Sequence, residues 1–290
     1  MRRSECLQPV CVALIAAAAL ALLGACSSVA PVRTAPQRMQ AIEANKQAAA
    51  LFERADYGGA VAKYREALML ERAIENEDGI AIDLINLSIA YQRLGNRDAA
   101  HAALREILES PFLRFPVQRI AEAAFRSAVL LLEAEDVAAA SGALARARAA
   151  CVEPGCALTG HLLNVQAQIF LLGKDFAGAR ALAEQALGIN RQRGETAEQA
   201  NSLRLMGAAL LELDQKDAAQ RAVIESLAID KGLSQPVKIL RDLRLLGRIA
   251  AAREAKEEAR GYHERALAVA RATGDREATA DLERLVRDRP

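Results

Sequence analysis

The sequence predicts an all-α protein built from repeated helix pairs, and three observations support that prediction. The chain is 52% hydrophobic but only 3% aromatic, and Ala and Leu, both strong helix formers, supply most of the apolar residues. No run of β-branched or aromatic residues alternates with polar ones at the period of two that a half-buried strand requires. A similar two-helix pattern recurs about every 40 residues, which is typical of a solenoid.

Residues 1–25 have the pattern of a secretion signal that is removed from the mature protein. Arg2 and Arg3 provide a positively charged start, and an unbroken apolar run extends from Val12 to Leu23. This run is shorter than the roughly 20 residues that a membrane-spanning helix needs. An ordinary signal peptide and an uncleaved anchor are the alternatives to a lipoprotein signal.

The end of this segment resembles the lipobox of bacterial lipoproteins, because residues 23–26 are Leu-Gly-Ala-Cys. The resemblance implies cleavage before Cys26 and lipidation of its thiol, and two or three acyl chains would hold the protein on a membrane. Residues 26–38 would then comprise the lipidated cysteine and a flexible tether. Ser27 follows where Asp would indicate retention in the inner membrane, so we expect the outer membrane, with the protein facing the periplasm.

Two cysteines remain in the expected mature domain, Cys151 and Cys156, and they are candidates for a disulfide. An oxidising compartment favours their pairing, and the Val-Glu-Pro-Gly between them is a turn sequence. Closing so short a loop contributes about 2 kcal/mol to stability. The spacing differs from the C-x-x-C of redox proteins, so a redox role is not expected.

The charge balance argues against nucleic acid as a partner. Removing Arg2, Arg3 and Glu5 with the signal from the 38 basic and 37 acidic residues leaves equal numbers of each. Nucleic-acid binding depends on neutralising many phosphates, and a chain without net charge lacks that driving force.

One copy of the repeat consists of two amphipathic segments separated by a break at Gly95-Asn96. Residues 87–107 resemble the tetratricopeptide repeat (TPR), a pair of antiparallel helices whose backbones meet at small residues. The Trp and the closing Pro of the TPR pattern are missing, and the step is longer than that of the TPR pattern, which implies longer helices. In six copies the small residue that opens the second helix recurs at steps of 39 or 40, at Ala60, Ala100, Ala140, Ala179, Ala219 and Ala259.

This resemblance implies a right-handed superhelical solenoid of about six helix-turn-helix repeats over residues 39–290. Residues 276–287, with apolar residues among charges, are expected to form the helix that caps its open end. His263 occupies the slot of a large residue in a second helix, so we expect it to be packed rather than to act as a ligand or base.

A TPR solenoid has a concave face made mainly by the first helix of each repeat, and we expect binding there. Arg241, Arg244 and Arg248 share one helical face and would form a basic patch for carboxylates. The alternative is an ordinary solvated face balanced by nearby acidic residues. The candidate groove residues are Asn45, Phe125, Asn164, Gln168, Asn201, Arg204, Arg241, Arg244 and Arg248.

Protein binding is the function that these features favour. No catalytic, phosphate-binding or metal-binding motif is evident, so no enzyme activity, cofactor or metal is expected. The expected partners are other envelope proteins or peptides, in a scaffold for secretin or pilus assembly or for cell-envelope maintenance, with the membrane contacted through the N-terminal lipid. The alternatives are a sensor that binds a small ligand or glycan, and an undetected cell-wall enzyme.

Overall fold

The computed structural model describes residues 36–151 and 156–287, which form thirteen α-helices and no strand. Twelve of these helices make six antiparallel pairs, and a last helix follows them, as predicted from the repeat. The first helices of the pairs are α2 (Pro36–Glu53), α4 (Glu77–Arg93), α6 (Val117–Glu133), α8 (Thr159–Leu172), α10 (Thr196–Glu212) and α12 (Pro236–Ala252). The second helices are α3 (Tyr57–Ala73), α5 (Arg97–Glu109), α7 (Val137–Ala150), α9 (Phe176–Arg193), α11 (Lys216–Gly232) and α13 (Lys256–Thr273), and the cap is α14 (Arg276–Arg287).

The turn between the two helices of each pair repeats in detail. One residue of every such turn has a positive φ, but only the second repeat uses glycine there. The next residue caps the second helix in the first four repeats, where its Asp or Asn side chain accepts a hydrogen bond from a backbone N–H in the first turn of that helix. The positive-φ residues are Ala55, Gly95, Glu135, Lys174, Asp214 and Glu254.

Small residues allow the paired helices to approach closely. The alanine that opens the second helix is fully buried in the first five repeats and nearly so in the sixth. Gly207 of α10 leaves space for Val223 of α11, since a Cβ on Gly207 would lie 2.3 Å from the Val223 Cγ2. Gly247 of α12 plays the same part for His263 of α13, whose ring packs against it. Burial and then Arg244 lower the pKa of His263.

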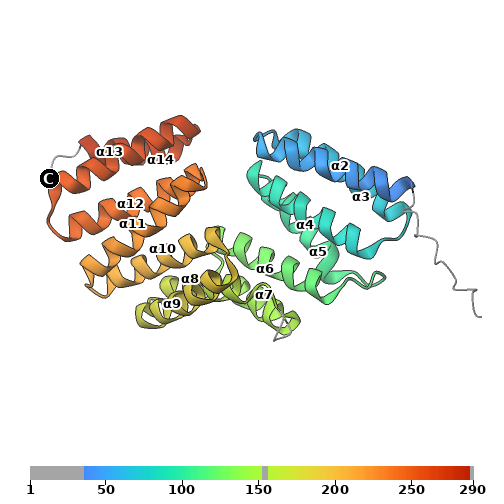
Figure 1. Ribbon diagram of the computed structural model, residues 1–290, viewed down its shortest axis with the longest axis horizontal. Coiled ribbons are helices and arrows are strands. Elements are labelled where there is room, and N and C mark those ends of the chain that lie inside the picture. The colour runs from blue at the N-terminus through green and yellow to red at the C-terminus, as the bar shows by residue number, and fades with distance from the viewer. Residues whose placement is uncertain (1–35, 152–155, 288–290) are drawn as a thin grey trace, which may run out of the picture.

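The helix pairs follow one another along an open arc, with α2 and α3 at one end and α13 and α14 at the other (Figure 1). From α4 to α12, successive first helices contact one another, while the second helices contact mainly their neighbouring first helices. Neighbouring helices lie closer together on the inside of a curve, so the first helices line the inner side of the arc. We call the surface that they form there the inner face.

The N-terminal predictions concern residues outside the described part of the chain. The expected signal peptide, Cys26 and nearly all of the expected tether lie there, although α2 begins at Pro36, slightly before the expected start of the solenoid at residue 39. In the described residues, no helix is both long and apolar enough to cross a membrane. Cys151 and Cys156 form a disulfide, with Cα atoms 5.3 Å apart.

Candidate functional site on the inner face

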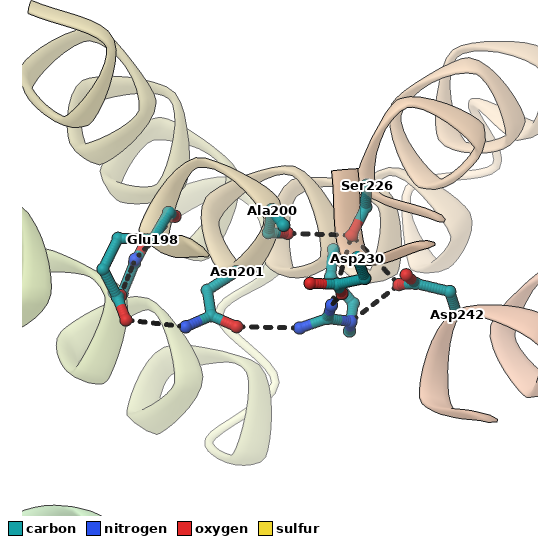
Figure 2. Close-up of polar contacts among 8 residues, drawn as sticks. Glu198, Ala200, Asn201, Ser226, Asp230 and Asp242 are labelled. Atoms are coloured by element: carbon teal, nitrogen blue, oxygen red, sulfur yellow. Dashed lines mark hydrogen bonds and ion pairs between the residues drawn. The ribbon is translucent and has the colours of Figure 1, made fainter. Parts of the chain in front are cut away.

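A chain of hydrogen bonds runs along the inner face from α8 to α12 (Figure 2). Glu198 of α10 stands at one end, where its two carboxylate oxygens accept hydrogen bonds of 2.9 Å from the side-chain amides of Asn164 and Asn201. The Asn201 side-chain oxygen in turn accepts a 2.9 Å hydrogen bond from Arg204. Three of the candidate groove residues therefore belong to one internal network.

Arg204 is the centre of the other end of this network. Its Nε donates a 2.7 Å hydrogen bond to Asp242 of α12, and one terminal nitrogen pairs with Asp230 of α11. Both aspartates are fully buried, whereas 13% of the Arg204 side chain is exposed. Ser226 of α11 lies between them and contacts Asp242 at 3.0 Å. The guanidinium of Arg204 thus joins α10, α11 and α12, and its hydrogen-bonding capacity is largely used within the protein.

The charged form of Asp230 is disfavoured in spite of this arginine. Burial raises the pKa of Asp230 to about 6, Arg204 opposes that rise, and the nearby Asp242 adds to it. Two carboxylates beside one guanidinium leave one charge only partly compensated. The pair is therefore a structural junction that depends on Arg204.

Three other cations of the inner face have no such partner. Arg126 of α6 and Lys238 and Arg241 of α12 neither form an ion pair nor donate a hydrogen bond to any residue that the structure describes, although Arg126 lies over the ring of its neighbour Phe125. Burial among surrounding protein atoms lowers the pKa of each of the three. We call Arg126, Lys238 and Arg241 the open cations.

Electrostatic interactions across the arc place the open cations inside its curve. Arg241 of α12 interacts with Arg204, with Glu133 of α6 and with Arg93 at the end of α4. Arg126 of α6 interacts with Glu198 of α10. These interactions connect first helices of neighbouring and of more distant repeats, which is possible only for side chains that project toward the centre of the arc.

Two acidic neighbours of the open cations, Glu198 and Glu133, are already hydrogen-bonded to amides. Glu198 accepts from Asn164 and Asn201, and Glu133 accepts a 2.6 Å hydrogen bond from Gln92 of α4. Their other acidic neighbours, Glu122 and Asp230, pair with Arg119 and Arg204. Because each of these carboxylates already has another partner, the open cations retain free donors that face the interior of the arc. This arrangement can accept carboxylate groups from outside the protein.

The three arginines of the predicted basic patch on α12 have different partners in the structure. Arg248 pairs with Glu212 of α10 at 2.9 Å, and Arg244 approaches Asp281 of α14 at 4.0 Å. Arg241 alone of the three has no ion-pair partner among the described residues. Helical spacing showed that the three share a face, but the partners lie on other helices.

The remaining candidates occupy different environments. Phe125 is buried, with its ring 5.6 Å from that of His161 in an edge-to-face contact between α6 and α8. Asn164 is also buried, so both residues serve the packing between repeats rather than an open groove. Gln168 is exposed on α8, and Asn45 is half-buried on α2. Side chains on the inner edge of a first helix meet the next repeat, which explains why some of them are covered.

Sequence reasoning missed Arg126, Lys238 and Glu198. Lys238 lies one helical turn before Arg241 on the same helix, so the helical spacing used for the arginines could have included it. Arg126 offers no comparable signal, because only the curvature of the arc brings α6 toward α12. In the described residues, no cluster of three or more potential metal ligands occurs.

Comparison with known proteins identifies the fold. No family model matches the sequence, and the search of curated proteins found no similar sequence. A structure of a tetratricopeptide repeat protein from Parabacteroides merdae is 12% identical, with a TM-score of 0.50 over 86% of this chain and 99% of that one. The fold is a TPR solenoid.

Two further TPR-like neighbours show the same arrangement of helices. The Pseudomonas aeruginosa pilF structure is 16% identical, with a TM-score of 0.53 over 85% of this chain and 98% of that one. A Rap protein, solved in complex with Competence and Sporulation Factor, is 15% identical and has a TM-score of 0.64 over 87% of this chain and 70% of that one. At these identities the likeness concerns the fold.

Proposed function

We propose that this TPR protein is a lipid-anchored scaffold of the cell envelope whose inner face binds an acidic segment of a partner protein. The observation that carries the proposal is the set of open cations, Arg126, Lys238 and Arg241. Partly desolvated cations without partners bind carboxylates more strongly than fully solvated ones, because part of the desolvation cost has already been met on folding.

The neighbouring structures are consistent with a protein partner. The Rap protein was solved as a complex with Competence and Sporulation Factor. Secretin or pilus assembly and cell-envelope maintenance are the envelope processes in which we propose such a scaffold acts. A shallow inner face offers few deep pockets, so we expect a dissociation constant around micromolar, or about −8 kcal/mol.

The binding test uses a fluorescein-labelled peptide of ten glutamates as the probe. We expect Arg126→Gln and Arg241→Gln each to weaken binding about tenfold, and the weakening to shrink as salt is raised. The matched control is Arg248→Gln, because Arg248 is an exposed arginine of the same helix that is paired with Glu212. Equal binding by all four proteins, measured by fluorescence anisotropy, would refute the role of the open cations.

The partner itself is sought by crosslinking in cells. The tagged protein is crosslinked, purified and analysed by mass spectrometry, in parallel with an Arg126→Gln, Arg241→Gln double variant. We expect an envelope protein with an acidic segment that is captured by the original protein and depleted from the variant. Equal capture of every partner by both proteins would contradict binding at the inner face.

The membrane anchor is part of the proposal and has its own test. The sequence pattern around Cys26 supports lipidation, and the following residues up to Pro36 can act as a tether. In cells fed labelled palmitate, Cys26→Ser should lose the label and leave the membrane fraction, while Cys156→Ser should keep both. A Cys26→Ser protein that remains labelled and membrane-bound would show that the anchor lies elsewhere.

A further inference from the structure

Three equivalent positions flank the junctions between successive repeats when the repeats are aligned on their opening alanines. The first lies on the first helix of a repeat, the second near the end of its second helix, and the third on the first helix of the next repeat. At the junction of the fifth and sixth repeats, these positions hold Arg204, Asp230 and Asp242, which bond to one another as described above. We call the three positions the junction triad.

The junction of the fourth and fifth repeats shows that the triad is a recurring contact. There the three positions hold Asn164, Asn190 and Ser202. The Ser202 hydroxyl donates a 2.8 Å hydrogen bond to Asn164 and accepts a 3.1 Å hydrogen bond from Asn190. The same three places therefore meet in space when their side chains are neutral.

Another junction shows that the fold does not require polar groups at these places. Phe125, Cys151 and Leu162 fill the triad at the junction of the third and fourth repeats. They belong to one hydrophobic cluster. A charged triad is thus a property of particular junctions, and it calls for a reason beyond packing.

The first junction carries two carboxylates without a cation. Its triad is Asn45, Glu71 and Asp83, so an amide stands where Arg204 stands in the fifth repeat. Glu71 is 4% exposed and Asp83 is fully buried. Glu71 accepts a 2.6 Å hydrogen bond from Asn76, but both carboxylate oxygens of Asp83 and the side-chain oxygen of Asn45 are buried without a hydrogen-bond partner among the described residues.

A second cation of the later junction is also missing from the first. Lys238, which acts on Asp230 electrostatically, lies one helical turn before Asp242, and the equivalent residue before Asp83 is Gly79. The Glu71 carboxylate fills the place of a side chain at Gly79, because a Cβ there would lie 2.5 Å from the Glu71 carboxyl carbon. Among the described residues, no cation acts on Asp83 as Arg204 and Lys238 act on Asp230.

We propose that Asn45, Glu71 and Asp83 form a receptor for an arginine side chain of a partner protein. The arginine would enter from the inner face beside Asn45, which is half-buried and shorter than an arginine, and its guanidinium would donate hydrogen bonds to Asp83. Arg204 is the internal precedent, because its guanidinium reaches the equivalent carboxylates and remains partly exposed.

The electrostatics around Asp83 agree with this assignment. Burial raises the pKa of Asp83 to about 7, Glu71 adds to the rise, and a side-chain contact with Asn45 opposes it. A carboxyl group in this range gives up its proton when a cation arrives near neutral pH. The receptor goes beyond the proposed binding of an acidic segment, because its carboxylates would bind a basic side chain of the partner, and they lie at the N-terminal end of the arc.

The test uses a single capped residue as the probe, N-acetyl-arginine N-methylamide, with the citrulline analogue as the uncharged control. Isoleucine methyl signals of the full chain in detergent micelles report binding, since Ile80 and Ile85 flank Asp83 on α4. We expect saturable shifts of these signals with a dissociation constant on the order of 1 mM. The citrulline analogue should leave them unchanged.

Variants test whether Asn45, Glu71 and Asp83 bind arginine or only stabilise the fold. Asp83→Asn should weaken binding at least tenfold, and Asn45→Arg should do the same, because its own guanidinium would take the place of the probe beside Asp83. The matched control is Glu106→Gln, which removes an exposed carboxylate of α5 and should bind as the original protein does. Undiminished binding to Asn45→Arg, or equal shifts with the citrulline analogue, would overturn the proposal. Neither probe depends on the open cations, so failure of the acidic-peptide test leaves this one intact.

Discussion

Asp83 and Asp242 stand at the same position of two different repeats, but their surroundings differ in charge. Asp242 accepts a hydrogen bond from Arg204, while the groups around Asp83 are the amide of Asn45 on α2 and the acidic Glu71 on α3. A buried carboxylate without a cation resists ionisation, because burial disfavours its charged form. The two positions should therefore respond differently to pH and to mutation.

Asp83→Asn should stabilise the protein at alkaline pH. The pKa of Asp83 is raised from 3.8 to about 7 in the folded state, so the unfolded chain releases this proton first as pH rises from about 4. The resulting penalty grows up to about pH 7 and is complete above it. We expect the variant to gain roughly 1–4 kcal/mol in the free energy of unfolding at pH 8, and little at pH 4.

Urea denaturation at the two pH values measures this difference. The groups facing Asp83 that titrate are Glu71 and Tyr64 of α3, and neither supplies a positive charge. Asp217→Asn is a suitable control, because that side chain is 74% exposed and should shift stability by less than about 1 kcal/mol. A gain for Asp83→Asn that is equal at pH 4 and pH 8 would contradict the charge argument.

Arg204→Met should destabilise the protein strongly at pH 8. It would remove the only guanidinium that is hydrogen-bonded to the buried Asp230 and Asp242 among the described residues, a change that costs roughly 3–5 kcal/mol. The loss should be smaller at pH 5, where Asp230, with a pKa of about 6, carries a proton. Arg248→Met removes an exposed pair and should cost less than about 1 kcal/mol. Similar losses for both variants in denaturant unfolding would exclude a special role for Arg204.

At the scale of elements, the turn inside each helix pair combines a left-handed residue with the start of the second helix. Five of the six turns place a non-glycine residue at the left-handed position, where an L-amino acid is strained by contact of its Cβ with the backbone. The helices on both sides are long and well packed, so their packing holds these residues in a backbone conformation that is unfavourable for them. Glycine therefore marks the left-handed position in only one of these six turns.

Glu135→Gly should stabilise the turn between α6 and α7, and Gly95→Ala should weaken the equivalent turn between α4 and α5. Each change is expected to alter the free energy of unfolding by about 1 kcal/mol, in opposite directions. Nothing lies within 4 Å of a Cβ built on Gly95, so backbone strain accounts for its loss. Thermal unfolding measures both changes, and shifts of the same sign would refute the argument.

At the scale of the whole molecule, the solenoid is held together by contacts between neighbouring repeats. Its hydrophobic clusters follow one another from α2 to α14, and each covers only adjacent helices. In such a chain, stability is approximately a sum of local terms. The arc can therefore loosen at one end while the other remains folded.

Leu282→Ala should loosen the C-terminal end alone. Leu282 is the fully buried anchor of the cap α14, and its truncation removes roughly 2–5 kcal/mol of packing. Hydrogen exchange should become faster in α12, α13 and α14, and remain unchanged in α2 to α5. Leu285→Ala is the control on the same helix, since Leu285 is 52% exposed. Faster exchange throughout the chain would show that the solenoid unfolds as one unit.

The sequence alone determined the helical class, the number of repeats and the cap, because these depend on local apolar periodicity and on small residues at regular steps. It also placed His263 against its partner helix. The free or paired state of each inner-face charge was decided only by tertiary structure. Arg204 meets Asp230 and Asp242, which lie 26 and 38 residues further along the chain. Curvature brings such distant groups together, and helical spacing carries no information about it.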